Sequence, residues 1–269
     1  MSKKNSMHTL KLDAHGADVK KLQKKLTKLG FPVGNIDGEF GPATEAALLA
    51  FQHSQDLLAD GVAGPRTLAA LGLTDDASLP SAIPDITPQL VSRMFPATPL
   101  GNIKANLPPV LDGLVAFELV DTPMVMVALA TIRAETESFE PVAEGRSRFN
   151  TSPNGHPFDL YDRRANLGNK GQPDGALFCG RGYVQLTGRD NYARYGKLLG
   201  VKLVEHPELA CDPTLAGRIL AAFLKAKERV IKQALRDDDM RAARRAVNGG
   251  SHGLDRFTDA FRRGSALIG

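Results

Sequence analysis

The sequence predicts a mostly α-helical protein with a small N-terminal domain and a larger domain behind it. Three observations predict this fold class. Apolar residues recur at helical spacing in residues 17–31, a helix-start motif occurs twice between residues 36 and 71, and helical patterns dominate from residue 86 onward. Hydrophobic residues make up 42% and charged residues 24% of the 269 residues, which is typical of a globular protein.

The first predicted helix lies in residues 17–31, ADVKKLQKKLTKLGF. Val19, Leu22 and Leu26 share one face, and lysines cover the opposite one. Gly30 favours the end of the helix, because glycine adopts the left-handed conformation that follows many helices. This segment therefore reads as an amphipathic helix that packs against a small core.

The pattern D-G-x-x-G-P-x-T occurs in IDGEFGPATEAAL from residue 36 and again in ADGVAGPRTLAAL from residue 59. Asp-Gly favours a turn, and a proline at the first helical position wastes no N–H. We therefore expect further helices after Pro42 and Pro65, and a three-helix domain over residues 9–73. A spacer or a dimerisation bundle would have the same pattern. The acidic, proline-bearing stretch 74–85 is predicted to be a linker.

The larger domain, residues 86–269, opens with helical patterns behind Thr87 and in LPPVLDGLVAFELV. A third helix, TPMVMVALATIRAETESF, is apolar nearly all round, so it should be buried, with Thr122 as its N-cap. Glu135 lies near the end of this helix. The helix dipole and apolar neighbours disfavour a negative charge there, which suits a general acid.

Two more helical runs are expected at about residues 213–234 and 238–247. The second includes RDDDMRAARRAV, which reads as a solvated helix. Between the third helix and these runs lies a long irregular stretch, residues 140–180, that is either functional or disordered. The segment GRGYVQLTGRDNYARYG follows it, and its polar side chains suit sugar hydroxyls and amides. These side chains are Gln185, Thr187, Asn191 and Tyr192.

The formal net charge of +4 and the sequence pI of about 9.1 suit an anionic partner such as nucleic acid, a membrane surface or a bacterial cell wall. A nucleic-acid binder would need a basic, aromatic-interleaved stripe, which this sequence lacks. No apolar run approaches the ~18 residues of a membrane span. Cys179 and Cys211 are expected to be reduced thiols.

The small domain resembles the peptidoglycan-binding domain of many cell-wall hydrolases. The resemblance covers VKKLQKKLTKLGF and both D-G-x-x-G-P-x-T motifs. It implies that a shallow groove binds the sugars or stem peptides of the wall. The residues that it suggests as wall contacts could equally be there to build turns. They are Asp37, Gly38, Phe40, Asp60 and Gly61.

The larger domain resembles glycoside hydrolase family 19, which holds plant-type chitinases and many phage endolysins. The motifs AETESF, GRGYVQLTGRDNY and VNGGSHGLDR occur in the order of that family, with an acid-bearing loop after the first. The resemblance implies a two-lobed, lysozyme-like α-helical catalytic domain with a cleft between its lobes. The whole chain resembles a modular phage or prophage endolysin.

The family places its general acid in H-E-[ST]-x-x-F, which reads A-E-T-E-S-F here, so the resemblance makes Glu135 the acid. Ala134 replaces the family histidine, which puts any supporting role of that histidine in doubt. Glu144 matches the second glutamate, which activates water, and Thr187 matches a residue that holds this water. Glu137 and Glu140 are expected to be solvated. The remaining expected substrate contacts are Gln185, Asn191, Tyr192, Asn248, Arg256 and Tyr161.

These inferences predict an inverting muramidase that cuts the MurNAc–GlcNAc bond of peptidoglycan and lyses a host bacterium. We expect a monomer without metal or cofactor, with peptidoglycan as its partner and no stable membrane insertion. The N-terminus lacks the apolar region of a secretory signal, so synthesis in the host cytoplasm is expected, with access to the wall after membrane permeabilisation.

Three alternatives remain open. A chitinase would use the same residues on another polymer. A zinc amidase or peptidase would need clustered ligands, whereas the six histidines are scattered along the sequence. A non-catalytic wall-binding protein would not need both Glu135 and Glu144.

Overall fold

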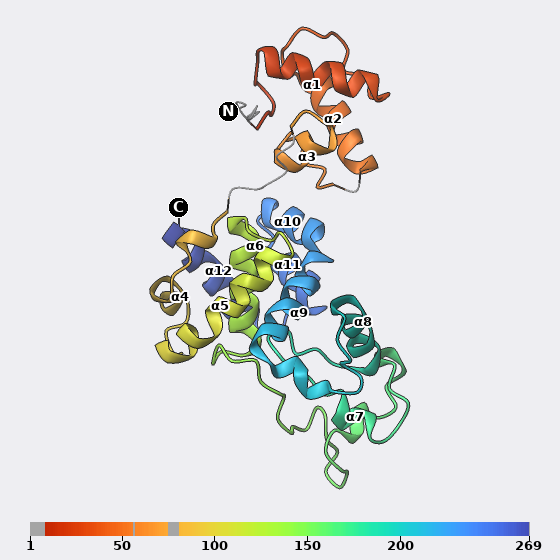
Figure 1. Cartoon of the computed structure of the whole chain (residues 1–269), viewed down its shortest axis with the longest axis vertical. Helices are drawn as coiled ribbons and strands as arrows, with labels where there is room; N and C mark the ends of the chain where they lie inside the picture. Colours follow the sequence, from red (N-terminus) through yellow and green to blue (C-terminus); the bar gives the residue numbers. More distant parts are fainter. Residues whose placement is uncertain (1–8, 56, 75–80, 269) are drawn as a thin grey trace. The chain divides into compact units, whose positions relative to one another are not determined.

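The computed structural model describes residues 9–55, 57–74 and 81–268. The chain folds into two compact units, Met1–Ser81 and Ala82–Gly269, and Figure 1 shows the helices of each. Apart from isolated β-bridges, the regular elements of the described residues are all helical. The predicted mostly α fold class is therefore confirmed.

The smaller unit contains three helices around one apolar core, as the sequence predicts. Pro42 and Pro65 are the first residues of the second and third helices, where the missing proline N–H has no helical partner in any case. The core is built from one face of each helix and from the segments between them. The helices are α1 (Ala17–Lys28), α2 (Pro42–Ser54) and α3 (Pro65–Ala70).

The larger unit is an assembly of helices joined by one long irregular segment between α6 and α7. The predicted run over residues 213–234 is interrupted, and it forms two helices, α9 and α10. The α-helices are α4 (Pro88–Met94), α5 (Leu100–Ala116), α6 (Thr122–Glu135), α7 (Asp174–Leu177), α8 (Arg189–Leu199), α9 (Pro213–Lys225), α10 (Glu228–Arg236), α11 (Met240–Asn248) and α12 (Leu254–Ile268). Short 3-10 turns are η1 (Ile83–Asp85), η2 (Asp159–Tyr161), η3 (Ala165–Leu167) and η4 (Pro207–Cys211).

Helix α6 is the centre of the main core. Every residue from Met124 to Ala134 is buried, as its apolar sequence predicts, and the helix packs against α12, α9 and α10. One detail of the prediction is wrong. The N-cap is Asp121, whose carboxylate accepts a hydrogen bond from the Met124 N–H at 3.3 Å, and Thr122 is already the first helical residue.

Helices α5 and α9 approach each other closely because both carry glycine at the contact. A Cβ atom at Gly113 would lie 2.5 Å from the carbonyl oxygen of Gly217, and a Cβ atom at Gly217 would lie 2.4 Å from the carbonyl oxygen of Pro109. Neither backbone could stay in place beside a larger residue. This contact fixes the position of α9 against α5. Helix α9 also contributes a side chain to the cleft described below.

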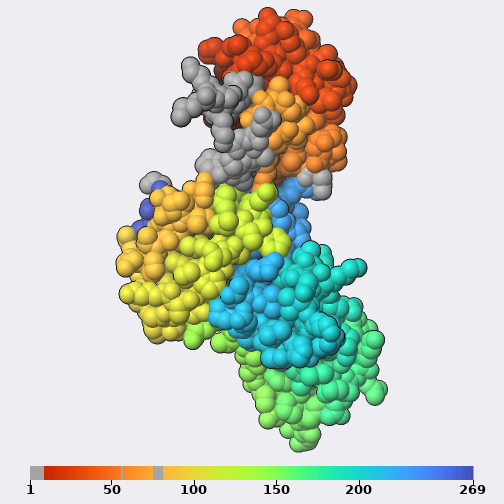
Figure 2. Space-filling model, in the orientation of Figure 1, coloured from red at the N-terminus to blue at the C-terminus, as the bar shows by residue number. Residues whose placement is uncertain are grey.

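The larger unit has two apolar clusters. One surrounds α6, and the other joins residues of α8 and α9 with Phe178, Leu186 and Leu203. Phe117, Val184 and Phe223 pack against both clusters and connect them. Figure 2 shows the two parts of this unit, with the yellow α4 and α5 segments gathered in one and the green and teal segments in the other.

The boundary of the larger unit differs from the prediction. Residues 75–80 of the expected linker 74–85 lie outside the described residues. The last part of that stretch is not a linker, because Ala82 is 4% exposed and donates its N–H to the Val120 carbonyl at 2.8 Å. Ile83 packs against the same core. The larger unit thus begins at Ala82.

Candidate active site

Glu135 is the last residue of α6, and its side chain is 13% exposed. The helix ends there because Thr136 leaves the helical conformation, at φ −134° and ψ 58°. Ala134, where the resembling family has a histidine, is buried close to Gly253. A Cβ atom at Gly253 would lie 3.3 Å from the Ala134 Cβ. A side chain at position 253 would therefore crowd Ala134.

A buried guanidinium holds the Glu135 carboxylate. The Arg244 side chain is 0% exposed, and its Nη2 donates to Glu135 Oε1 at 2.6 Å. Its Nε donates to the His252 carbonyl at 2.9 Å, and its guanidinium lies 5.7 Å from the centre of the Phe257 ring. Glu135 therefore has a fixed orientation and a charged neighbour, in addition to the apolar surroundings that α6 provides.

The sequence interpretation of α11 as a solvated helix is wrong at this residue. Met240, Ala243 and Val247 are buried on one face of the helix, and Arg244 belongs to the same i, i+3, i+4, i+7 stripe. One arginine on an otherwise apolar stripe is a signal of a buried partner, and Glu135 is that partner. The aspartates before the helix hid this pattern.

Three donors surround the carboxylate of Glu144. The Gly180 N–H donates to Oε1 at 2.7 Å, while Asn150 Nδ2 at 3.3 Å and the Tyr161 hydroxyl at 3.4 Å donate to Oε2. Burial and the neighbouring Glu144 charge raise the pKa of Tyr161, so its hydroxyl keeps the proton that it donates. An ionised carboxylate is an acceptor only, so three donors match it.

The backbone around Glu144 is paired with the segment that carries Gln185. The Glu144 N–H donates to the Gly180 carbonyl at 2.8 Å, and the Gly182 N–H donates to the Val142 carbonyl at 3.0 Å. A Cβ atom at Gly180 would lie 2.8 Å from Gln185 Oε1 and 3.3 Å from Glu144 Oε1. Glycine at 180 is therefore what lets these two side chains approach the same point.

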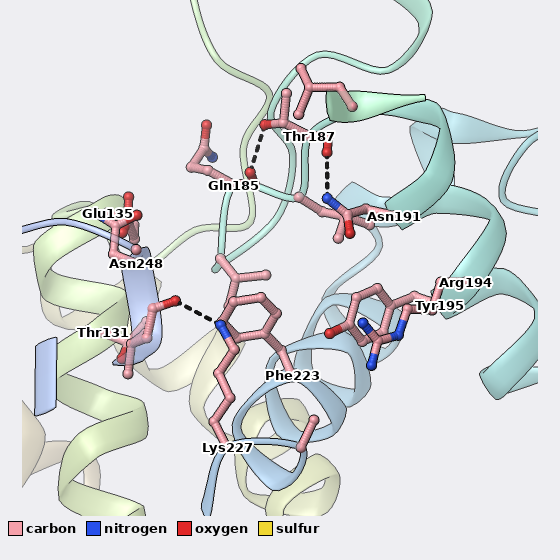
Figure 3. Close-up of a pocket in the computed structure, with 16 residues that line it drawn as sticks. Thr131, Glu135, Gln185, Thr187, Asn191, Arg194, Tyr195, Phe223, Lys227 and Asn248 are labelled. Carbon is pink, nitrogen blue, oxygen red and sulfur yellow. Dashed lines mark hydrogen bonds between the residues drawn. The ribbon is translucent and has the colours of Figure 1, made fainter. Parts of the chain in front are cut away.

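Gln185 adopts a left-handed backbone conformation, with φ at 49°. This conformation is uncommon for a residue with a side chain and is often found at functional sites. The turn that it makes presents the next polar residues in a chain of hydrogen bonds. Thr187 Oγ1 donates to the Gln185 carbonyl at 2.8 Å, and Asn191 Nδ2 donates to the Thr187 carbonyl at 2.7 Å (Figure 3).

A cleft of about 490 Å³ lies in the larger unit, with residues of both apolar clusters in its wall. Figure 3 shows the side chains around it, contributed by α6, α8, α9, α11 and the turn before α8. Residues predicted from the family motifs meet here although they are far apart in the sequence. Those that line the cleft are Glu135, Gln185, Thr187, Asn191 and Asn248.

Other predicted residues lie elsewhere. Glu144 and Tyr161 belong to the neighbouring loop, joined to the cleft through the Gln185 turn. Arg256 forms a solvent-exposed ion pair with Glu137 at 3.3 Å. The prediction that Tyr192 contacts substrate is wrong, because its side chain is 0% exposed and its hydroxyl donates to the Cys179 carbonyl at 2.8 Å.

Glu137 and Glu140 are exposed, as expected for solvated carboxylates. The cleft also contains side chains that no motif indicated. Arg194 and Tyr195 come from α8, Phe223 comes from α9, and Lys227 lies between α9 and α10. Their positions follow from how α8 and α9 pack, which the sequence pattern does not reveal.

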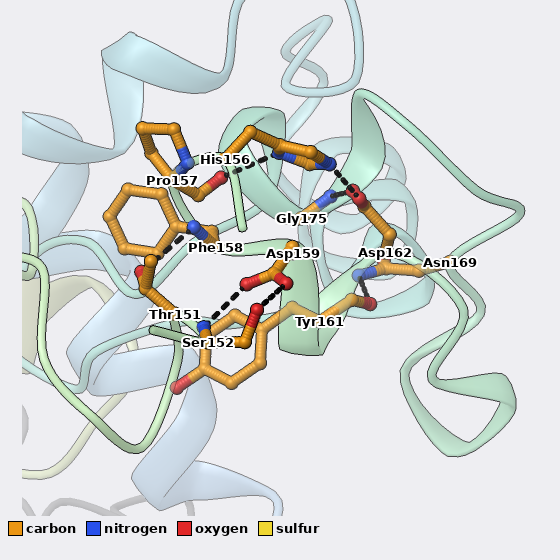
Figure 4. Close-up of polar contacts among 10 residues, drawn as sticks. All are labelled: Thr151, Ser152, His156, Pro157, Phe158, Asp159, Tyr161, Asp162, Asn169 and Gly175. Carbon is orange, nitrogen blue, oxygen red and sulfur yellow. Dashed lines mark hydrogen bonds and ion pairs between the residues drawn. The ribbon is translucent and has the colours of Figure 1, made fainter. Parts of the chain in front are cut away.

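The long segment between α6 and α7 is ordered by polar contacts (Figure 4). Asp159 accepts hydrogen bonds from the Ser152 N–H at 2.8 Å and from the Ser152 hydroxyl, and these lower its pKa. His156 Nε2 lies 2.9 Å from an Asp162 carboxylate oxygen. These contacts close the loop on itself and place Tyr161 beside Glu144.

In the smaller unit, the first D-G-x-x-G-P-x-T motif wraps around the buried side chain of Gln23. Its Nε2 donates to Asp37 Oδ1 at 2.8 Å, to the Glu39 carbonyl at 3.0 Å and to Thr44 Oγ1 at 3.2 Å. Its Oε1 accepts from the Gly38 N–H at 2.8 Å. The Gln23 hydrogen bond is the largest cause of a lowered pKa at Asp37.

The second motif repeats this arrangement around Gln52. Its Nε2 donates to Asp60 Oδ1 at 2.8 Å, to the Val62 carbonyl at 2.9 Å and to Thr67 Oγ1 at 3.2 Å, and its Oε1 accepts from the Gly61 N–H at 3.0 Å. Each motif therefore builds a turn that a buried glutamine fills. The sequence analysis missed both glutamines.

The residues predicted to contact the wall differ in their burial and in their role in these turns. The prediction for Phe40 is wrong, because its ring is 2% exposed and lies in the core. The side chains of Asp37 and Asp60, and the backbones of Gly38 and Gly61, have turn-building roles. Asp37 is also exposed, so its contact with the wall stays a prediction.

None of the helices of the described residues is long and apolar enough to cross a membrane. No group of three or more His, Cys, Asp or Glu side chains among them is arranged to hold a metal ion.

Comparison with known proteins assigns similarity to each unit. Residues 15–71 match the family model of a peptidoglycan binding domain. The chain is 44% identical over 64 residues to N-acetylmuramoyl-L-alanine amidase CwlM of Mycobacterium tuberculosis, covering 24% of this chain and 16% of that protein. It is 29% identical over 103 residues to a glycosyl hydrolase family 19 domain-containing protein of Haemophilus influenzae, covering 38% of this chain and 48% of that protein.

These matches span less than half the length of each curated relative. Among solved structures, chitinase C from Streptomyces griseus HUT6037 superposes with a TM-score of 0.51 at 18% identity, covering 73% of this chain and 82% of that chain. At this identity the likeness concerns the fold alone.

Proposed function

We propose that this chain is a cell-wall hydrolase that cleaves the glycan backbone of bacterial peptidoglycan. It joins a peptidoglycan-binding domain to a larger unit with a family 19 chitinase-like fold. In its full form, the proposal is an endolysin with muramidase activity, which cuts the MurNAc–GlcNAc bond with inversion and lyses a host bacterium.

The observation that supports this function best is the pair of differently held carboxylates beside one cleft. Glu135 lines the cleft at the end of a buried helix, with Arg244 as its hydrogen-bond partner. Glu144 lies behind the Gln185 turn with three donors around it. Glycoside hydrolysis by inversion needs two carboxyl groups in different surroundings, with room for a water molecule.

In the proposed reaction, the protonated carboxyl of Glu135 gives its proton to the glycosidic oxygen as the bond to the anomeric carbon breaks. Glu144 takes a proton from a water molecule, whose oxygen attacks the opposite face of that carbon. Glu135 is left negatively charged, and the Arg244 guanidinium stabilises that charge. Thr187 keeps its lone pairs free to accept from the water, because its own hydroxyl donates to Gln185.

The smaller unit would hold the enzyme at its substrate. A domain that binds the wall raises the effective concentration of the catalytic unit there without changing the chemistry of the cleft. Deleting residues 1–80 should therefore weaken binding to purified wall and leave cleavage of soluble fragments intact. Unchanged wall binding would contradict this role.

Glu135→Gln tests the catalytic assignment. We expect the release of new reducing ends to fall by roughly two to four orders of magnitude, because the amide cannot donate the proton. Glu140→Gln is the matched control, since Glu140 is an exposed glutamate of the next segment. Equal activity of the two variants would refute Glu135 as the acid.

A chitinase is the second candidate, favoured by the fold shared with chitinase C. The same two carboxylates would then act on a neutral N-acetylglucosamine polymer. The peptidoglycan-binding domain favours the wall polymer instead. Turnover of purified peptidoglycan and of chitin oligosaccharides, compared at equal sugar concentration, separates these candidates.

A further inference from the structure

The cleft contains a lysine that no part of the proposed reaction uses. Lys227 is partly buried and lies at the start of α10. Its ammonium lies 3.9 Å from the centre of the Phe223 ring and donates to the Val247 carbonyl at 3.3 Å. In Figure 3 its side chain runs along Phe223, with Thr131 and Glu135 to one side and Arg194 and Tyr195 to the other.

A second cation lines the same cleft. Arg194 is an exposed residue of α8, and its charge and the burial of Lys227 both lower the pKa of Lys227. Within the part of the chain that the structure describes, neither side chain forms an ion pair. The nearby carboxylate of Glu228 is paired with Lys225 at 3.0 Å and with Lys232 at 2.8 Å.

The wall of the cleft offers these cations no free counter-charge. Among the described residues that line it, Glu135 is the single acidic side chain, and Arg244 holds its carboxylate. Two cations that repel each other in a partly enclosed site are an arrangement that an anionic ligand would stabilise. A neutral ligand would remove the two cations from water without offering a negative charge in return, which costs free energy.

We propose that Lys227 and Arg194 bind a carboxylate of the polymer substrate and thereby select peptidoglycan over chitin. Chitin is a neutral polymer, whereas peptidoglycan carries carboxylates on its stem peptides, or on the muramic lactyl groups where no stem peptide is attached. Both sources offer the same group to a lysine and an arginine. The inference rests on the proposed glycan cleavage, and it adds the determinant of polymer choice.

The primary test uses Arg194→Gln, because Arg194 is exposed and its contact within the described residues is its position over the Tyr195 ring at 5.8 Å. We expect KM for acid-bearing glycan strands to rise about tenfold, the value of one charge-assisted contact, with little change in kcat. KM for neutral chitin oligosaccharides should not change. Lys197→Gln, at an exposed lysine of the same helix that does not line the cleft, is the matched control.

Lys227→Met keeps an apolar stem on Phe223 and removes the charge, and Lys227→Arg restores a charge. Because the Lys227 ammonium also holds the end of α11 through Val247, the Tm of both variants is measured first. A specific loss on acid-bearing strands in Lys227→Met, recovered in Lys227→Arg, supports the site. An equal loss on neutral and acid-bearing substrates would mean that Lys227 has only a structural role.

Chemical amidation of the substrate provides the second arm. Strands stripped of stem peptides carry free lactyl carboxylates, so comparing them with their amidated form tests that source. Comparing intact peptidoglycan with its amidated form tests the carboxylates of the stem peptides. The KM of the wild type should rise about tenfold when amidation removes the carboxylate that is recognised. On that amidated substrate, Arg194→Gln should have the same KM as the wild type. Equal KM values on native and amidated forms of both substrates overturn the inference.

Binding separates a failure of this inference from a failure of the proposed function. If the wild type releases no new reducing ends from any glycan, the proposed cleavage is wrong. Calorimetric titration of the Glu135→Gln protein with native and amidated strands still tests the cation pair. Binding that does not depend on the carboxylates contradicts it in either case.

Discussion

Glu135 lines the cleft and Glu144 lies in the neighbouring loop, and the two carboxyl groups are held in opposite ways. Glu135 ends a buried helix, and one fully buried guanidinium from α11 meets it. Glu144 belongs to a loop, and three separate donors from that loop and from Gly180 surround it. One carboxyl group has a single charged partner and the other has three uncharged ones. Perturbing these partners should therefore have unequal effects.

Arg244→Met should produce the largest effect. It removes the guanidinium that donates to Glu135, and it leaves the His252 carbonyl without the hydrogen bond from Arg244 Nε. Losing a charge-assisted hydrogen bond to a largely buried carboxyl group typically costs about 3 kcal/mol of unfolding free energy. Denaturant unfolding would measure this loss. A change under about 1 kcal/mol would show that the pair contributes little to the fold.

On the Glu144 side, Asn150→Ala should cost about 2 kcal/mol, because it leaves buried groups without a partner. Asn150 is 1% exposed, and besides Glu144 it bonds the Gly145 carbonyl at 2.9 Å and the Ser147 N–H at 2.8 Å. Activity should fall with stability, since Glu144 loses one of its supports. Unfolding and turnover of Asn150→Ala would check this, with Asn154→Ala, at an exposed asparagine of the same loop, as the control.

Acidic pH should destabilise the part of the larger unit that contains Glu144, because it weakens the ion pair between Asp174 and Arg189. This buried carboxylate of α7 accepts hydrogen bonds from Arg189 Nε at 2.8 Å and Nη2 at 2.5 Å, which joins α7 to α8. The Arg189 hydrogen bonds are the largest cause of the lowered pKa of Asp174. A lowered pKa stabilises the fold above the unfolded value of about 3.9, and this contribution is lost as pH falls through the lower folded value.

Asp174→Asn should therefore lower the unfolding free energy by about 1.5 kcal/mol at pH 7, and the difference from the wild type should shrink below about pH 4. Unfolding curves of both proteins between neutral and acidic pH measure this. A difference that grows towards acidic pH would reverse the sign and contradict the ion-pair explanation.

Tyr161→Phe should have the smallest effect, about 0.5 kcal/mol of stability, because the hydroxyl contact to Glu144 is long at 3.4 Å. Two shorter or comparable donors to Glu144 remain. A modest shift of the pH–rate profile is expected, since a donor to the proposed base is lost. Loss of most of the activity would mean that Tyr161 touches the substrate.

The sequence predicted a small domain and a larger one, the buried helix with Glu135 near its end, and part of the motif residues that line the cleft. Its errors share one cause, which is that residue type does not reveal burial. Phe40 and Tyr192 were read as ligand contacts, yet both rings are in the core. Arg244 was read as solvated, although it lies on the buried stripe of α11.

A second cause explains why some functional and structural residues could not be predicted from the sequence. Gln23 and Gln52 act through contacts with turns 14 or more and 8 or more residues away, and no short motif contains both partners. Lys227 and Arg194 reach the cleft only because α8 and α9 pack together. Such pairs depend on tertiary packing, which local spacing does not encode.

Mass spectrometry of the ends released from purified peptidoglycan tests the central claim most directly, with Glu135→Gln measured beside the wild type. We predict reducing MurNAc ends from the wild type and none from the variant. Reducing GlcNAc ends would keep the acid–base pair but move the cut to the other bond. Intact glycan strands with freed stem peptides would contradict the proposed glycosidase.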